Sequence, residues 1–396
     1  MSSQLHTPKP IYLDHSATTP VSPEVLAAML PYFADKFGNA SSVHRYGREA
    51  RMAVDSAREK VASLIGANPR EIIFTSGGTE ADNLAIKGIA RSMQSKGNHL
   101  VTTRIEHHAV LHTFESLEKE GFKVTYVPCD KNGLIDPEDI RRAVTKNTIL
   151  ISVIHGQNEV GTIEPIEEIG SIAREHNILF HSDAVQSAGK IPIDVNRSGI
   201  DLLTVSSHKM YGPKGVGALF LRKGTRLSPQ TTGGAHEKGL RAGTENVPGI
   251  VGFGEACRLA ETGLPQESKR LSGLRDRLIH GLLSEIPETV LNGHPVKRLP
   301  HNVNISVKHV EGEAMLLNLD LLGVAASSGS ACTSGSLEPS HVLLAMGLDH
   351  ETAHGSLRMT LGRSTTEEDV DYVVRIMPPI VKRLRSMSVF GQSSGF

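Results

Sequence analysis

A single lysine stands in a short, glycine-containing connection between two apolar stretches of the chain. Lys209 follows the apolar run 201–205 and precedes the apolar run 215–221, and both runs are typical of buried strands. Gly212 and Gly215 allow a cofactor to approach the backbone of this connection closely. A lysine amine held in a partly dry pocket loses its proton readily and can form a Schiff base with an aldehyde. Most loop lysines are simply solvated, so a reactive role for Lys209 depends on partners elsewhere in the chain.

A glycine turn earlier in the chain offers a site for a phosphate group. Gly77-Gly78-Thr79 joins a strand predicted at 71–76 to a helix predicted at 80–93. Free backbone N–H groups and the positive end of the helix dipole bind phosphate at such a position. The turn lacks the lysine of a P-loop and the glycine spacing of a dinucleotide fold, which favours a smaller phosphorylated cofactor. A purely structural turn is the alternative.

The arrangement of apolar runs predicts the fold. Strands alternate with helices between about residues 71 and 221, and this alternation indicates βαβ units and an α/β fold with a mostly parallel sheet. Ligands of such sheets bind beyond the carboxyl ends of the strands. The polar residues predicted to lie there are Thr79, His107, Asn158, Asp183 and Lys209.

A change of character near residue 262 predicts a second domain. A helix is expected from about Val247 to Glu261, followed by a boundary around Thr262 to Pro265 and a charged amphipathic helix from Lys269 onward. We therefore expect a large domain of residues 16–261. Residues 1–15 and 262–396 would form a smaller α+β domain.

Composition and charge exclude several classes of protein. The chain has 396 residues, 39% of them hydrophobic and 21% charged, with a net charge of −1. Such a balance is typical of an ordinary globular protein and argues against nucleic acid or an anionic membrane as the main partner. The first residues lack the apolar core of a signal peptide, and no later run is long enough to cross a bilayer. These features predict a cytoplasmic protein.

The three cysteines must be interpreted one by one, because they have neither the number of a disulfide framework nor the spacing of a zinc site. Cys129 and Cys257 are expected to be buried and inert, as most free cysteines are. Cys332 lies in a run of small, turn-prone residues within a loop of about residues 325–337, which we expect to be mobile and exposed. A thiolate there can attack the sulfur of a bound substrate and carry it away as a persulfide.

Taken together, these stretches resemble the cysteine desulfurases of the NifS/IscS type, which are pyridoxal-phosphate enzymes of fold type I, the aspartate aminotransferase fold. The resemblance covers nearly the whole chain, from Tyr12 to Arg363. It implies a large domain with a mostly parallel seven-stranded sheet flanked by helices, and a smaller domain that carries the cysteine loop. Its most specific stretches are Ser206-Ser207-His208-Lys209, His181-Ser182-Asp183-Ala184-Val185-Gln186, Arg241-Ala242-Gly243-Thr244-Glu245-Asn246 and Ser328-Gly329-Ser330-Ala331-Cys332-Thr333-Ser334-Gly335.

The resemblance also implies a role for each candidate residue. Lys209 would form the Schiff base with pyridoxal phosphate and move the proton, and Asp183 would keep the pyridine nitrogen protonated so that the ring accepts electrons. His107 would stack on the ring and act as acid or base, although a lone histidine is more often a packed or capping side chain. The other implied cofactor ligands are Asn158 and Gln186 at the phenolic oxygen, Thr79, Ser206 and His208 at the phosphate with the Gly78 backbone, and Thr244 reaching the phosphate of a neighbouring subunit. Arg358 and Asn39 would bind the substrate carboxylate.

The implied reaction converts L-cysteine to L-alanine and passes a Cys332 persulfide to an iron–sulfur scaffold or another sulfur-acceptor protein. The enzyme would be a cytoplasmic homodimer that requires no metal, with Cys332 able to ligate an iron–sulfur cluster transiently. A selenocysteine lyase or an aminotransferase of the same fold is the alternative enzyme, but an aminotransferase needs no thiol such as Cys332. A sulfur-carrier scaffold without catalysis is a third possibility, and it has no chemical need of Lys209, Asp183 and His107 together.

Overall fold

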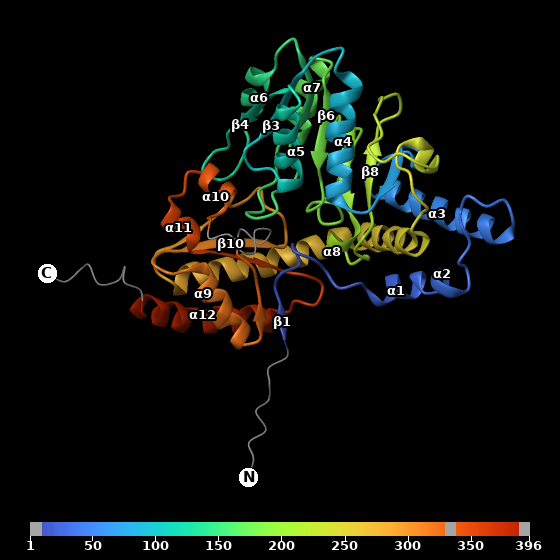
Figure 1. Ribbon diagram of the computed structural model, residues 1–396. Helices are drawn as coiled ribbons and strands as arrows, with labels where there is room; N and C mark the ends of the chain where they lie inside the picture. Colours follow the sequence, from blue (N-terminus) through green and yellow to red (C-terminus); the bar gives the residue numbers. More distant parts are fainter. Residues whose placement is uncertain (1–9, 329–337, 388–396) are drawn as a thin grey trace.

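An open sheet of seven strands lies at the centre of the part of the chain that the computed structural model describes, residues 10–328 and 338–387 (Figure 1). The strand order is β2-β8-β7-β6-β5-β3-β4. β8 is antiparallel to both of its neighbours, and every other pair is parallel. This arrangement confirms the predicted α/β fold with a mostly parallel sheet. The strands are β2 (Ile72–Thr75), β3 (His99–Thr103), β4 (Lys123–Val127), β5 (Thr148–Ser152), β6 (Leu179–Asp183), β7 (Leu202–Ser206) and β8 (Gly217–Leu221).

Both faces of this sheet are covered by helices. Successive residues of a strand point to opposite faces, so neighbouring residues report on the two sides of the sheet. Ile73 and Leu219 belong to a hydrophobic cluster with α4 and α5. Their neighbours Phe74 and Phe220 belong to another cluster, with α3, α7 and part of α8. The sheet is therefore the middle of three layers. The helices are α3 (Arg45–Leu64), α4 (Gly78–Met93), α5 (His108–Lys119), α7 (Ile166–Glu175) and α8 (Val247–Glu285).

A separate hydrophobic cluster joins the start of the chain to its last third. Leu13 packs there with residues such as Leu278, Val303 and Leu357. A three-stranded sheet of order β12-β10-β9 and a two-stranded parallel sheet of β1 and β11 belong to this part. The division into residues 16–261 and the remainder stays a prediction. Its elements are β1 (Ile11–Tyr12), β9 (Thr289–Leu291), β10 (Asn302–Val307), α9 (Gly312–Leu321), β11 (Val324–Ala325), β12 (Ser356–Thr360) and α12 (Glu367–Met387).

One long helix crosses the expected domain boundary. α8 runs without interruption from Val247 to Glu285 and contains Pro265, so the prediction of two helices separated near residues 262–265 is wrong. A proline inside a helix removes one hydrogen bond and crowds the preceding turn. Here Cys257 packs in the large cluster and Leu271 in the cluster of the last third. This packing on both sides outweighs the local effect of the proline, and α8 links the two parts (Figure 1).

The remaining short elements connect these layers. None of the helices within the described residues is long and apolar enough to cross a membrane. The short elements are α1 (Pro23–Met29), α2 (Pro31–Ala34), η1 (Pro69–Glu71), α6 (Pro137–Ala143), η2 (Ser207–Lys209), η3 (His236–Gly239), α10 (His341–Ala345) and α11 (His350–His354).

Candidate active site

The polar residues predicted at the strand ends meet in one cavity of about 340 Å³. The structure therefore brings together most of the candidate residues, although they come from distant parts of the sequence. The predicted residues that line the cavity are Gly78, Thr79, His107, Asn158, Asp183, Gln186, Ser206, His208, Lys209 and Arg358. Its other lining residues are Ser16, Ala17, Asp82 and Val185.

Lys209 lies on the connection between β7 and β8, as predicted, at the end of the short helix η2. Its Nζ donates hydrogen bonds to the carbonyl oxygens of Ser16, at 2.6 Å, and Ala17, at 2.8 Å. Gln186 Nε2 donates to the same Ser16 carbonyl at 2.9 Å. The segment at residues 16–17 therefore fixes the lysine amine and the Gln186 amide relative to each other.

Asp183 is the last residue of β6 and is buried at the base of the cavity. Its Oδ1 accepts a hydrogen bond of 2.8 Å from the backbone N–H of Val185. Burial raises the pKa of Asp183 to about 6, while the Val185 N–H and the charge of Lys209 act in the opposite direction. The carboxyl is thus fixed and is able to share a proton with a basic partner near neutral pH.

Asp82 on α4 is a second buried carboxyl of this cavity, and the sequence analysis missed it. Burial and the charge of Asp183 raise the pKa of Asp82 well above its usual range. Two carboxyls close together in a dry site do not both ionise readily, so the pair retains a proton. The sequence did contain a signal for Asp82, because this carboxylate lies on α4 among apolar residues that are buried, such as Ala81, Leu84 and Ala85.

The N-terminus of α4 forms the other end of the site. α4 begins at Gly78, with Gly77 before it and no side chain capping its first turn. An adjoining cavity of about 450 Å³ is lined by this turn together with Ser206, His208 and Lys214. Ser206 Oγ is buried without a hydrogen-bond partner among the described residues. A helix N-terminus, an unpaired hydroxyl and a lysine are suited to a phosphate group.

His107 is the N-cap of α5 and also lines the cavity. Its Nδ1 accepts a hydrogen bond of 3.1 Å from the backbone N–H of Ala109. Burial, followed by the charge of Lys209, lowers the pKa of His107 to about 4. The ring is therefore neutral at physiological pH and carries its proton on Nε2. The capping role and a role against an aromatic ligand are both available to this side chain.

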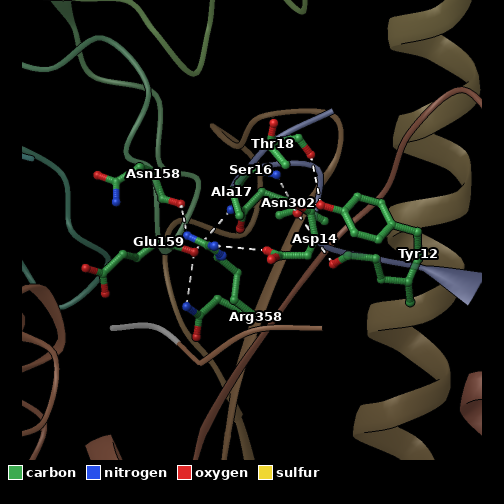
Figure 2. A network of polar contacts seen from close by, with 12 residues as sticks. Tyr12, Asp14, Ser16, Ala17, Thr18, Asn158, Glu159, Asn302 and Arg358 are labelled. Carbon is green, nitrogen blue, oxygen red and sulfur yellow. Dashed lines mark hydrogen bonds and ion pairs between the residues drawn. The ribbon is translucent and has the colours of Figure 1, made fainter. Parts of the chain in front are cut away.

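Arg358, in the middle of β12, is held on two sides (Figure 2). Its Nη2 donates to Asp14 Oδ1 at 3.1 Å, and its Nη1 donates to the carbonyl oxygen of Asn158 at 3.0 Å. The residue is only 3% exposed. Arg358 Nε is buried and makes no hydrogen bond to any described residue. The guanidinium is thus positioned, with an N–H group left for an incoming carboxylate.

Asp14 was also missed by the sequence analysis. Burial raises the pKa of Asp14, and the charge of Arg358 opposes the rise. Tyr12 Oη donates to the carbonyl oxygens of Asp14 and Thr18, at 3.1 and 3.0 Å, and so braces this turn (Figure 2). The sequence signal was weak, because a carboxylate just after a short strand is common on protein surfaces.

Asn158 and Gln186 lie on the cavity wall with partly satisfied amides. Asn158 Oδ1 accepts a hydrogen bond of 3.3 Å from Gln157 Nε2. Gln186 Oε1 is buried and has no hydrogen-bond partner among the described residues. Each amide therefore retains a group able to bind a polar substituent of a ligand in the cavity.

Asn39 and Thr244 lie outside this cavity. Asn39 is exposed on the loop between α2 and α3, where its Oδ1 accepts a hydrogen bond of 2.9 Å from the backbone N–H of Ser41. Thr244 is exposed on the loop before α8, beside Glu245, which pairs with Arg51 at 2.9 Å. The roles given to these two residues stay predictions.

The predicted nucleophile Cys332 lies outside the described residues, but both ends of its segment can be placed. The backbone of Ser327 exchanges two hydrogen bonds with Arg358, of 2.7 and 3.1 Å. After the segment, Ser340 Oγ donates to Glu159 Oε2, next to Asn158. The described residues on either side of the segment therefore contact Arg358 and Glu159.

Of the other two cysteines, Cys257 is buried as expected, whereas Cys129 is only half-buried. Burial raises the pKa of Cys129 to about 12 and raises the pKa of the fully buried Cys257 as well. Both thiols remain protonated at neutral pH, and a thiol is a far weaker nucleophile than a thiolate. In the described parts of the chain, no group of three or more histidine, cysteine, aspartate or glutamate residues is arranged to hold a metal ion.

Comparison with known proteins gives a consistent family. The model of the class-V aminotransferase family matches residues 11–373. Cysteine desulfurase IscS of Clostridium botulinum is 55% identical over 382 residues, which are 96% of both chains. The protein of the same name from Methanosarcina thermophila is 55% identical over 380 residues, covering 96% of this chain and 94% of the relative.

Solved structures agree with these relatives. A structure described as a NifS-like protein has a TM-score of 0.89 at 38% identity and covers 95% of this chain and 100% of its own. The structure of SspA in complex with cysteine has a TM-score of 0.80 at 39% identity, covering 89% of this chain and 98% of its own.

Proposed function

The chain belongs to the class-V aminotransferase family and is a pyridoxal-phosphate-dependent cysteine desulfurase, and from this premise we propose the role of each residue in its site. The observation that carries the assignment is the meeting of Lys209, Asp183, His107 and Arg358 in one cavity. An amine, a buried carboxyl, a neutral imidazole and a guanidinium are the groups that the conversion of an amino acid on this cofactor requires.

The cavity residues fit pyridoxal phosphate. Asp183 lies where it can hold a pyridine nitrogen, and Gln186 Oε1 and Ser206 Oγ are buried polar atoms that need partners. A Cβ at Gly78 would lie 2.8 Å from Val185 Cγ2, which also lines the cavity, so a larger residue would crowd the start of α4. When bound, the cofactor supplies an aldehyde and a ring that accepts the electrons of the substrate carbanion. The phosphate would lie at the α4 N-terminus with Thr79, Ser206 and His208.

The substrate would be bound and deprotonated by residues of this chain. Arg358 Nε offers the free N–H group of a fixed guanidinium to the carboxylate of L-cysteine. Asn39 is kept as the proposed second donor, although it lies on an exposed loop outside the cavity of this chain. The amine of Lys209 removes the proton from the substrate Cα and later returns a proton to carbon. His107 keeps its ring neutral, with its proton on Nε2.

Sulfur transfer is assigned to Cys332. Its thiolate forms a bond to the substrate sulfur while the carbon–sulfur bond of the substrate breaks, and the electrons of that bond remain with the carbon skeleton. Protonation of the skeleton yields L-alanine, and the sulfur stays on Cys332 as a persulfide. The anchoring of Ser327 and Ser340 beside the cavity supports this assignment, as does the high pKa of the thiols of Cys129 and Cys257.

We further propose a homodimer in which Thr244 reaches the phosphate site of the partner subunit. Exposed apolar side chains on α1, α2 and the start of α3 support a protein interface. Phe33 is 62% exposed and Met52 72% exposed, and the rings of Phe37 and Tyr46 stack at a centroid distance of 5.5 Å. Light scattering coupled to size exclusion tests this proposal, and a monomer at micromolar concentration would contradict it.

The persulfide would pass to an iron–sulfur scaffold or another sulfur-acceptor protein, and Cys332 could ligate a cluster during that transfer. We propose a cytoplasmic location, because a reaction that depends on a free thiolate requires a reducing compartment.

A sulfur balance tests the proposed function. The purified protein with L-cysteine and a thiol reductant should release alanine and sulfide in equal amounts, and without reductant it should carry an extra sulfur atom on Cys332 by peptide mass mapping. Cys332→Ala should bind cysteine but release no alanine, and Cys129→Ala is the matched control that should remain active. Extra sulfur on Cys129 or Cys257, or full turnover by Cys332→Ala, would refute the mechanism.

A further inference from the structure

Residues 157–161 form a turn, here named the cavity turn, which carries Asn158 on the wall of the active-site cavity. Gln157 Oε1 accepts hydrogen bonds from the backbone N–H groups of Glu159, at 2.6 Å, and Val160, at 2.9 Å. Gln157 Nε2 donates to Asn158 Oδ1 at 3.3 Å. The position of the cavity turn therefore sets the position of the Asn158 amide.

Two asparagines of β10 hold the cavity turn. Asn302 Nδ2 and Asn304 Nδ2 donate to the same acceptor, the carbonyl oxygen of Glu159, at 3.1 and 3.0 Å. A carbonyl oxygen has two lone pairs and can accept both hydrogen bonds. Arg358 Nη1 donates to the preceding carbonyl oxygen, that of Asn158, at 3.0 Å (Figure 2). Three side chains of β10 and β12 therefore bind two successive carbonyl groups of the turn.

The pairing of β10 with β12 places these donors in one unit. Asn304 lies directly opposite Arg358 in the antiparallel register. Asn304 Oδ1 accepts a hydrogen bond of 2.8 Å from Asn292 Nδ2, which orients the Asn304 amide so that its Nδ2 faces the turn. Val303, between the two asparagines, packs in the cluster of the last third on the other face of the strand. The guanidinium proposed for the substrate carboxylate and the turn that carries Asn158 are thus attached to the same two strands.

The polar character of this strand face indicates a role in positioning. Both asparagines are fully buried, and apolar residues would cover the same area without the cost of removing amides from water. Apolar contacts have no preferred direction, whereas hydrogen bonds fix both a distance and a direction. A reactive site needs its groups within about 0.5 Å of their productive places.

We propose that Asn302 and Asn304 are positioning residues of the active site. By holding the Glu159 carbonyl they set the place of Asn158 relative to Arg358, and so the fit of the Asn158 amide to the phenolic oxygen of pyridoxal phosphate. This inference rests on the proposed function, which assigns Asn158 to that oxygen.

A cofactor analogue tests the inference without any measurement of activity. The full-length apoenzyme is titrated calorimetrically with pyridoxal phosphate and with 3-deoxypyridoxal phosphate, which keeps the aldehyde and the phosphate but lacks the phenolic oxygen. Asn302→Ala and Asn304→Ala should each bind pyridoxal phosphate at least threefold more weakly than wild type, and the analogue within twofold of wild type. Either variant is sufficient if the other does not fold, and thermal melting of each apoenzyme shows whether it is folded.

Ser306→Ala is the matched control. Ser306 lies on the same face of β10 and is also fully buried, but its Oγ accepts a hydrogen bond of 2.9 Å from Asn292 Nδ2, which does not belong to the cavity turn. This variant loses a buried hydrogen bond of the same strand and should bind both ligands as wild type does.

A double-mutant cycle separates positioning from a general loss of structure. Asn158→Ala should weaken binding of pyridoxal phosphate but not of the analogue, and Asn304→Ala added to it should cause no further loss, because Asn304 acts through Asn158. Equal weakening of both ligands in the Asn302 and Asn304 variants, or the same loss with and without Asn158, would overturn the inference. If Asn158→Ala itself does not discriminate between the two ligands, the assignment of Asn158 fails and the inference with it. The desulfurase assignment is tested separately by the sulfur balance.

Discussion

Replacement of Arg358 by lysine should chiefly raise the KM for cysteine. The guanidinium makes three directed contacts possible: Nη2 to Asp14 at 3.1 Å, Nη1 to the Asn158 carbonyl at 3.0 Å, and Nε–H to a substrate carboxylate. A lysine ammonium is a single point of charge on a flexible chain. Asp14 lies beside position 358 and would pair with the ammonium group of the introduced lysine. The substrate carboxylate would then have no donor at this position.

The size of the effect follows from the bonds that are lost. One hydrogen bond to a charged group contributes about 1.5–3 kcal/mol. Because 1.4 kcal/mol corresponds to tenfold in an equilibrium constant, the KM should rise by roughly 10- to 150-fold. The carboxylate does not react, so its binding is equal in the ground state and the transition state, and kcat should fall far less than kcat/KM.

Steady-state alanine formation over a wide range of cysteine concentrations measures both constants. Arg375→Lys is a suitable control, because Arg375 lies on the exposed side of α12, over the ring of Tyr372, and does not line the cavity. Its KM should equal that of wild type. A KM for Arg358→Lys within twofold of wild type would place the carboxylate site elsewhere, and a large fall in kcat alone would show that Arg358 acts in the chemical step.

Three other changes have defined outcomes. Asp183→Ala should weaken binding of pyridoxal phosphate to the apoenzyme at least tenfold by fluorescence titration and remove most activity, and near-normal rates would mean that another carboxylate holds the ring. Burial raises the pKa of Glu106 to about 8 from 4.5, so the folded chain holds a proton that the unfolded chain releases, and stability is lost as pH rises between these values. Glu106→Gln should therefore show a smaller fall in Tm from roughly pH 5 to pH 8, and parallel curves would contradict the shift. In the Cys332→Ala variant, the thiols of Cys129 and Cys257 should react with iodoacetamide at roughly pH 8 at least a hundredfold more slowly than free cysteine. The reason is that burial raises the pKa of both thiols. Fast labelling would show that one of the two thiols reacts as an accessible thiolate.

Several of the predicted residues that line the cavity lie at the end of a strand. Lys209 follows β7, Asp183 ends β6, and His107 follows β3 after a short turn. In a parallel sheet these ends lie at one edge, so local patterns of apolar runs are enough to bring the residues together. A correct prediction of the parallel strands was therefore enough to predict that these residues lie close together.

The residues that were missed depend on contacts between distant segments. Asp14 acquires its role only because β1 and β12 bring it to Arg358, which is far away in the sequence. Asp82 becomes a partner of Asp183 only after α4 packs on the sheet. The continuity of α8 through Pro265 likewise reflects packing at both of its ends rather than local preference. Periodicity and turn signals describe a single segment, and they contain no information on such pairings.

The segment at residues 11–19 links the carboxylate site to the reactive lysine. β1 pairs with β11 in the smaller part of the molecule, and Asp14, two residues later, holds Arg358. The carbonyl oxygens of Ser16 and Ala17 then accept the hydrogen bonds of Lys209. A substrate carboxylate bound to Arg358 therefore acts on a side chain that is held by the same short stretch that fixes the lysine amine. Since coupling requires an element that both sites bias, this stretch is the physical route by which substrate binding can reach the lysine.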